Sequence, residues 1–90
     1  MAAKQTAPSI RDRIGRRLIQ IRLAFGESQS QFARRLGDPG LQKRLSDYES
    51  GKTGPTVDFL DRVSAIGVNV HWLICGTGKV WARKPRGVQL

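Results

Sequence analysis

Residues 28–51, SQSQFARRLGDPGLQKRLSDYESG, contain the pattern that decides the fold of this 90-residue chain. Ser28 and Gln31 have the spacing of a capping box, which starts a helix. Apolar residues follow on one helical face, at Phe32, Ala33 and Leu36, and Gly37 then stops the helix. The segment therefore opens with a predicted helix of barely two turns.

A tight turn is predicted after this helix, at Asp38, Pro39 and Gly40. Proline presets φ at one turn position, and glycine accepts a positive φ at the next. A second short helix is then predicted over 41–50, because Leu41, Leu45 and Tyr48 are spaced by four and three. The chain reverses direction between the two helices.

The residues before this segment predict one longer helix, with Ser9 as its N-cap and Gly26 as its stop. Apolar residues form a single stripe along it at Ile10, Ile14, Leu18, Ile21 and Phe25. The other faces carry Arg11, Arg13, Arg16, Arg17 and Arg22. This helix therefore has one apolar side and a strongly basic remainder.

Two further helices are predicted after the segment. Thr56 caps one that ends before Gly67, and Asn69 caps another that ends at Gly76. No stretch alternates with period two long enough to predict a strand. The expected fold class is all-α, a compact five-helix bundle.

A chain of this length has room for one core, because it buries only about 60 to 65% of its unfolded surface. We therefore expect a flexible N-terminal arm over 1–8, one helical domain over 9–78 and a basic C-terminal tail over 79–90. Val80 and Trp81 are the only strong anchors in that tail.

Sixteen Lys and Arg against seven Asp and Glu give a net charge of +9. A small domain this basic usually has a polyanionic partner, and nucleic acid is favoured over an anionic membrane. The charge is concentrated at the two ends, since residues 1–26 carry +5 and residues 79–90 carry +4.

Other classes of function lack the residues they need. A single cysteine, Cys75, cannot form an internal disulfide, and no apolar run near the start is long enough for a signal peptide or membrane span. We therefore expect a cytoplasmic protein without a membrane partner. His71 and Cys75 are the only imidazole and thiol, too few for a structural zinc site or a catalytic triad, so we expect no enzyme, no metal and no cofactor.

Two short helices joined by a turn, with helices on either side, form the arrangement that presents a helix to the major groove of DNA. Here the second helix would bury Leu41, Leu45 and Tyr48. Its outward side would then carry Gln42, Lys43, Arg44, Ser46 and Asp47.

These residues resemble the lambdoid-phage repressor type of helix-turn-helix, also called the XRE family. The resemblance runs from about Ile14 to Gly78. It rests on Ser-Gln at 28–29, Phe-Ala-Arg-Arg-Leu-Gly at 32–37, Tyr-Glu-Ser-Gly-Lys at 48–52, Pro55, and Gly-Val-Asn-Val-His-Trp-Leu-Ile-Cys-Gly-Thr-Gly at 67–78. The fold that it implies, a bundle of five helices, agrees with the five helices predicted from caps and stripes.

The resemblance also implies roles for individual residues. Gln29 would meet a DNA phosphate at the positive end of its helix dipole. The residues expected to read base edges are Gln42, Lys43, Arg44 and Asp47. Those expected to bind phosphates after the helix are Ser50, Lys52 and Thr53. The chemistry is suitable, because Gln bonds adenine, Lys and Arg bond guanine, and Asp accepts from cytosine.

Two expectations concern the first helix. Arg22 and Glu49 match positions where phage repressors place an ion pair, so we expect them to form a partly buried pair, with two solvated side chains as the alternative. Arg16 and Arg17 are expected to contact phosphates, since arginines in this helix far outnumber acidic residues; a merely solvated basic face is the alternative.

The sequence departs from the family pattern in two places. Ten residues separate Leu36-Gly37 from Tyr48-Glu49 where the usual number is eight, and 38–40 hold the surplus, which leaves the register of Gln42 and Lys43 open by a residue or two. Glu27 stands where an apolar residue is common.

The sequence as a whole predicts a sequence-specific repressor or regulator of phage type that binds a double-stranded DNA operator as a homodimer. An antitoxin of the same fold, which neutralises a toxin and represses its own operon, is the second hypothesis. A nonspecific nucleic-acid binder is the third.

Overall fold

The computed structural model describes residues 7–90, so most of the predicted N-terminal arm, residues 1–6, lies outside the described residues. The elements are α1 (Ile10–Ala24), α2 (Gln29–Arg35), the 3-10 helix η1 (Pro39–Leu41), α3 (Gln42–Ser50), α4 (Val57–Ala65) and α5 (Val70–Cys75). The predicted all-α fold with five helices is confirmed, and within 7–90 the only extended pairing is an isolated bridge between Val68 and Trp81.

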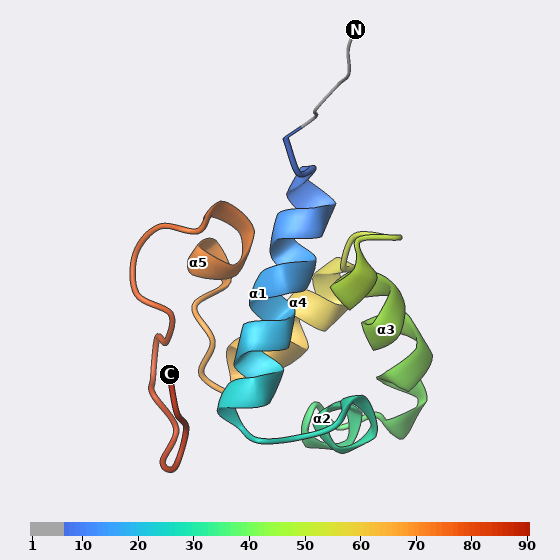
Figure 1. Cartoon of the computed structure of the whole chain (residues 1–90). Coiled ribbons are helices and arrows are strands. Elements are labelled where there is room, and N and C mark those ends of the chain that lie inside the picture. The colour runs from blue at the N-terminus through green and yellow to red at the C-terminus, as the bar shows by residue number, and fades with distance from the viewer. Residues whose placement is uncertain (1–6) are drawn as a thin grey trace, which may run out of the picture.

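Helix α1 lies at the centre of the molecule, with α3 on one side and α5 on the other (Figure 1). Ser9 and Asp12 form a capping box at its start. Gly15 allows the close approach of α3, because a Cβ built there would lie 2.5 Å from the carbonyl oxygens of Tyr48 and Glu49. The side of α1 that carries Gly15 is therefore the side that faces α3.

The turn between α2 and α3 differs from the prediction in its backbone conformation. Gly37, not Gly40, has the positive φ, at +88°. Asp38 then accepts a hydrogen bond from the backbone N–H of Gly40 at 2.9 Å, and Pro39 starts a turn of 3-10 helix. The predicted positive φ at Gly40 is wrong because the chain has already turned at Gly37, and the residues after it wind into η1.

The core lies between α1 and the shorter helices. Every helix contributes fully buried side chains, and Val68 adds one from the connection between α4 and α5. The largest are Phe32, Phe59, Leu18, Ile21, Leu41, Leu45, Leu73, Val63 and Val68. Leu41, the last residue of η1, is only 1% exposed, so the extra residues of the turn place an apolar anchor in the core. The longer connection is thus a packed part of the fold.

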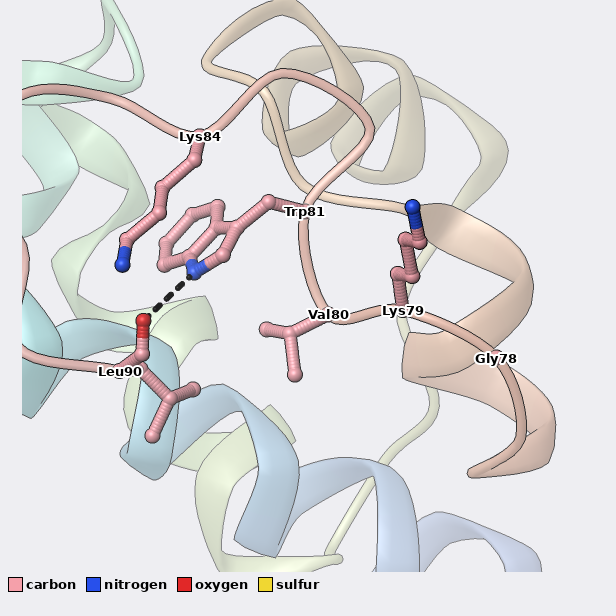
Figure 2. Close-up of a pocket in the computed structure, with 6 residues that line it drawn as sticks. All are labelled: Gly78, Lys79, Val80, Trp81, Lys84 and Leu90. Carbon is pink, nitrogen blue, oxygen red and sulfur yellow. Dashed lines mark hydrogen bonds between the residues drawn. The ribbon is translucent and has the colours of Figure 1, made fainter.

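The C-terminal segment, residues 79–90, packs against the core along part of its length. Trp81 is 9% exposed and meets Phe25 edge to face, with ring centroids 5.7 Å apart. Its indole N–H donates to the carbonyl of Leu90 at 3.3 Å (Figure 2). Both residues line a hollow of about 550 Å³. The backbone N–H of Gln89 donates to the carbonyl of Ala24 at 3.1 Å. The exposed basic side chains of this segment therefore extend from an anchored backbone.

Three arginines bind the carbonyl groups at helix ends. Arg17 donates to Leu73 and Ile74 at the end of α5, and Arg62 donates to Leu36 at the end of α2. Arg83 donates to Ser64 and Ala65 at the end of α4. The final carbonyls of a helix lack intrahelical partners and carry partial negative charge, so a guanidinium group suits them. Part of the positive charge of this chain is therefore used to hold the fold together.

Candidate nucleic-acid interface

Helix α3 has a buried side and a polar exposed side. Leu45 and Tyr48 are buried, and the ring of Tyr48 meets that of Phe59 edge to face at 4.7 Å. The exposed side carries the residues expected to read bases: Gln42, Lys43 and Arg44 are exposed and Asp47 is half-buried. The first three lie in the opening turn of the helix, where helix-turn-helix proteins contact base edges.

Glu49, on the inner side of α3, accepts hydrogen bonds from two other helices. Arg22 of α1 donates to it through Nε at 2.8 Å and through Nη2 at 3.0 Å. Gln29, the first residue of α2, donates to it through Nε2 at 3.0 Å. The structure thus brings Arg22 and Glu49 together as a bidentate pair, whose side chains are 17% and 4% exposed. These hydrogen bonds raise the pKa of the Arg22 guanidinium above its ordinary value.

The same arginine also fixes the connection from α1 to α2. Its Nη1 donates to the carbonyl of Glu27 at 3.0 Å, and the Glu27 carboxylate accepts two bonds from Arg35 at 2.9 and 2.7 Å. These bonds raise the pKa of Arg35, and its guanidinium lies 4.2 Å from the centroid of the Phe25 ring. Glu27, which departs from the family pattern, therefore pairs with Arg35, eight residues later in the chain. The sequence did not predict this pair.

Gln29 occupies the start of α2, as expected for a residue that meets a phosphate. Its amide nitrogen, however, donates inward to Glu49. An amide also has an oxygen, and the first backbone N–H groups of α2 lack helical partners. Ser28 accepts a hydrogen bond from the N–H of Gln31. The N–H groups of Gln29 and Ser30 come before the first intrahelical bonds of α2, so a phosphate could accept from them.

The residues after α3 form an exposed loop at its C-terminal end. Gly51 ends the helix with φ +80°, and the backbone N–H groups of Lys52 and Thr53 both reach toward the carbonyl of Asp47, at 3.0 and 3.4 Å. Their side chains are exposed, as is Ser50, whose hydroxyl donates to Asp47 at 3.1 Å. The three residues expected to bind phosphate thus lie close together in the chain, Ser50 as the last residue of α3 and Lys52 and Thr53 on the loop after it.

Sequence reasoning did not single out Arg11 for this loop. A Cβ built at Gly54 would lie 3.6 Å from the Cγ and Cδ atoms of Arg11, so the arginine stem lies beside Gly54 in this loop. Arg11 is exposed and comes eleven residues, about three helical turns, before Arg22. That spacing is the sequence signal that places it on the side of α1 that faces α3.

Arg16 and Arg17 do not lie on the side of α1 that faces α3. At about 100° per residue, Arg16 is turned about 100° and Arg17 about 200° from Gly15, which faces α3. Arg17 accordingly bonds to the end of α5. The structure therefore separates these two arginines from the other residues expected to bind phosphate, because helical periodicity carries them round the helix.

Residues 7–90 contain neither a candidate metal site nor a candidate membrane span. No three His, Cys, Asp or Glu side chains are grouped so that they could hold a metal ion, and His71 faces Thr77, with Nε2 and Oγ1 3.1 Å apart. None of the helices in this part of the chain has the length and apolar character that crossing a membrane requires.

Comparison with known proteins adds one finding. The model of the family described as helix-turn-helix matches residues 18–72, which include the end of α1, all of α2, α3 and α4, and the start of α5. The search of curated proteins and the search of solved structures found no match.

Proposed function

The chain belongs to the XRE-type, lambda-repressor-like helix-turn-helix family of DNA-binding transcriptional regulators, and we propose that it is a repressor of phage type that reads its operator with α3. One observation carries this proposal. The first turn of α3 presents Gln42, Lys43 and Arg44 to solvent while Leu45 and Tyr48 anchor the helix in the core.

This arrangement supports direct readout of bases in the major groove. Lys43 and Arg44 offer donors for the O6 and N7 atoms of guanine, and Gln42 can bond adenine through two atoms. Asp47, one turn further along, can accept from the amino group of cytosine. The pair of Arg22 with Glu49 holds α3 against α1, so these side chains are offered from a fixed helix.

Phosphate contacts on either side would set the register of α3 on the duplex. We assign them to Gln29 at the start of α2, to Ser50 at the end of α3, and to Lys52 and Thr53 on the loop after it. Arg11 lies beside that loop. Contacts of this kind fix orientation without reading sequence. We further propose that the protein acts in the cytoplasm as a homodimer on a two-fold operator, with half-sites about one helical turn apart.

The experiment is selection of bound sequences from randomised duplex DNA, followed by sequencing. It is run with the wild type, Lys43→Ala, Arg44→Ala and the control Lys84→Ala, which removes an exposed lysine from the C-terminal segment. We expect an enriched two-fold motif that relaxes at particular bases in the two α3 variants, with a cost of about 1 to 3 kcal/mol for each lost bidentate contact. The control should select the same motif as the wild type.

Equal retention of all sequences by the wild type would contradict the proposal and leave a binder driven by charge or a protein whose main partner is another protein. If all three variants lost base preference in the selected motif to the same extent, α3 would be excluded as the source of specificity.

A further inference from the structure

A second basic surface lies between α1 and α5. Arg13, Arg16, Arg17 and Gln20 of α1 and Trp72 of α5 line a groove of about 390 Å³, which we call the basic groove. We propose that the basic groove binds the phosphate backbone of a second DNA segment, so that one protein molecule can hold two duplexes together.

The basic groove faces away from α3. Relative to Gly15, which packs on α3, the α1 residues Arg13, Arg17 and Gln20 are turned by about 140 to 200° and Arg16 by about 100°. Figure 1 shows α5 and α3 on opposite sides of α1. A duplex that lies along α3 is therefore separated from the basic groove by the width of α1.

The basic groove combines exposed cations with an apolar wall. Arg13, Arg16 and Gln20 are exposed, while Trp72 is 9% exposed and forms the wall. Among the described residues, Arg16 has no ion-pair or hydrogen-bond partner for its guanidinium. A cleft lined by charge of one sign beside a low-dielectric wall concentrates the electric field at its mouth.

No carboxylate lines the basic groove. Asp12, the only acidic residue in α1, is turned toward the end of α3, where its carboxylate contacts the place that a Cβ on Gly51 would occupy. Its side chain also accepts from the N–H of Ser9. Arg13 donates to the carbonyl of Pro8 at 2.8 Å, and Arg17 to the carbonyls at the end of α5. These acceptors are neutral, so no carboxylate in the lining balances the positive charge of the basic groove.

Arg17 builds the groove and holds its two walls together. Its Nη1 donates to the carbonyls of Leu73 and Ile74 at 3.0 and 3.1 Å, which ties α5 to α1. Gly76 makes room for this guanidinium, since a Cβ there would run into Arg17. The groove is therefore formed before any ligand arrives.

The shape and charge favour a nucleic-acid backbone as the occupant. From Arg13 to Gln20 the groove extends about 10 Å along the axis of α1. One DNA strand carries a phosphate for every 3.4 Å or so of helix axis, so two or three phosphates can face this row. Guanidinium groups also match phosphate geometry through paired N–H donors.

The experiment measures bridging between two duplexes of random sequence. One duplex is fixed to beads, the other is fluorescent, and capture of the second duplex is measured with the full chain. Binding to a single duplex is measured separately for each variant. Arg13→Glu/Gln20→Glu changes the basic groove, and Arg86→Glu/Gln89→Glu makes the same two chemical changes at exposed positions of the C-terminal segment.

We expect the wild type to capture the second duplex, the groove variant to lose this capture by roughly tenfold or more, and the control variant to retain it. Binding of the first duplex should be retained by both. The proposal is overturned if the wild type does not bridge, if both double variants lose capture equally, or if the groove variant bridges like the wild type.

Two further outcomes would also overturn the proposal. If Lys43→Ala/Arg44→Ala abolishes bridging and the groove variant does not, a dimer bridges through its two α3 surfaces. If the groove variant lowers the sedimentation coefficient of DNA-free protein, the groove binds a second copy of the chain. Because both duplexes have random sequence, failure of operator recognition through α3 would leave this result unchanged.

Discussion

Glu49 of α3 accepts two hydrogen bonds from the guanidinium of Arg22 of α1, at 2.8 and 3.0 Å, and its side chain is only 4% exposed. The pair joins α3 to the helix that precedes the motif. Because Gln29 donates to the same carboxylate, three helices meet at one buried charge. The position of the surface proposed to read DNA thus depends on an interaction on its inner side.

Replacing Arg22 by Met should destabilise the protein by about 3 kcal/mol, because it leaves the Glu49 carboxylate buried without its cation. The double variant Arg22→Met/Glu49→Met removes both charges and should recover at least half of the loss. Urea denaturation followed by circular dichroism gives both values. A loss below 1 kcal/mol in the single variant would mean that the pair is effectively solvated.

Replacing Gly15 by Ala should destabilise the protein by about 2 kcal/mol, since overpacking at a tight contact exceeds the gain in helix propensity. The added methyl group would meet the carbonyl oxygens of Tyr48 and Glu49 and push α3 outward. Gly54→Ala is the control, because its methyl group would make an ordinary contact with Arg11 at 3.6 Å. Equal stability of the two variants in thermal unfolding would exclude a tight α1–α3 contact.

Replacing Trp81 by Ala should cost about 3 to 5 kcal/mol, as for other large buried side chains. The indole contacts Phe25 and bonds to Leu90, so its loss opens a cavity against α1. Lys84→Ala, an exposed change in the same segment, should stay within about 0.5 kcal/mol of the wild type. If Trp81→Ala were equally neutral, Trp81 would not anchor residues 79–90 to the core.

Replacing Lys52 by Ala should weaken binding uniformly across DNA sequences. The slope of log K against log salt concentration should become shallower by about one, the effect of one lost phosphate contact. Fluorescence anisotropy at several salt concentrations measures the slope, with Lys84→Ala as the control. An unchanged slope together with altered base preference would place Lys52 against a base instead of a phosphate.

The helices and their caps could be predicted from the sequence because those signals are local. Ser9, Ser28, Thr56 and Asn69 each cap a helix in the structure, and apolar residues at helical spacing fill the core. The positions of Gln42, Lys43 and Arg44 on an exposed face follow from the same periodicity. Capping and burial act over three or four residues, so they leave their mark in short windows of sequence.

The sequence by itself determined five helices, their caps and a strongly basic chain, whereas the tertiary structure decided which arginines have partners within the fold. Arg17, Arg62 and Arg83 hold the carbonyl ends of helices far away in the chain, Arg22 and Arg35 pair with carboxylates, and Arg11 joins the loop after α3. Amino-acid composition cannot distinguish these arginines, because each has the same side chain and the same charge. The role of an arginine depends on which backbone carbonyl or carboxylate the fold brings within about 3 Å of its guanidinium group. Only the packed structure sets that distance.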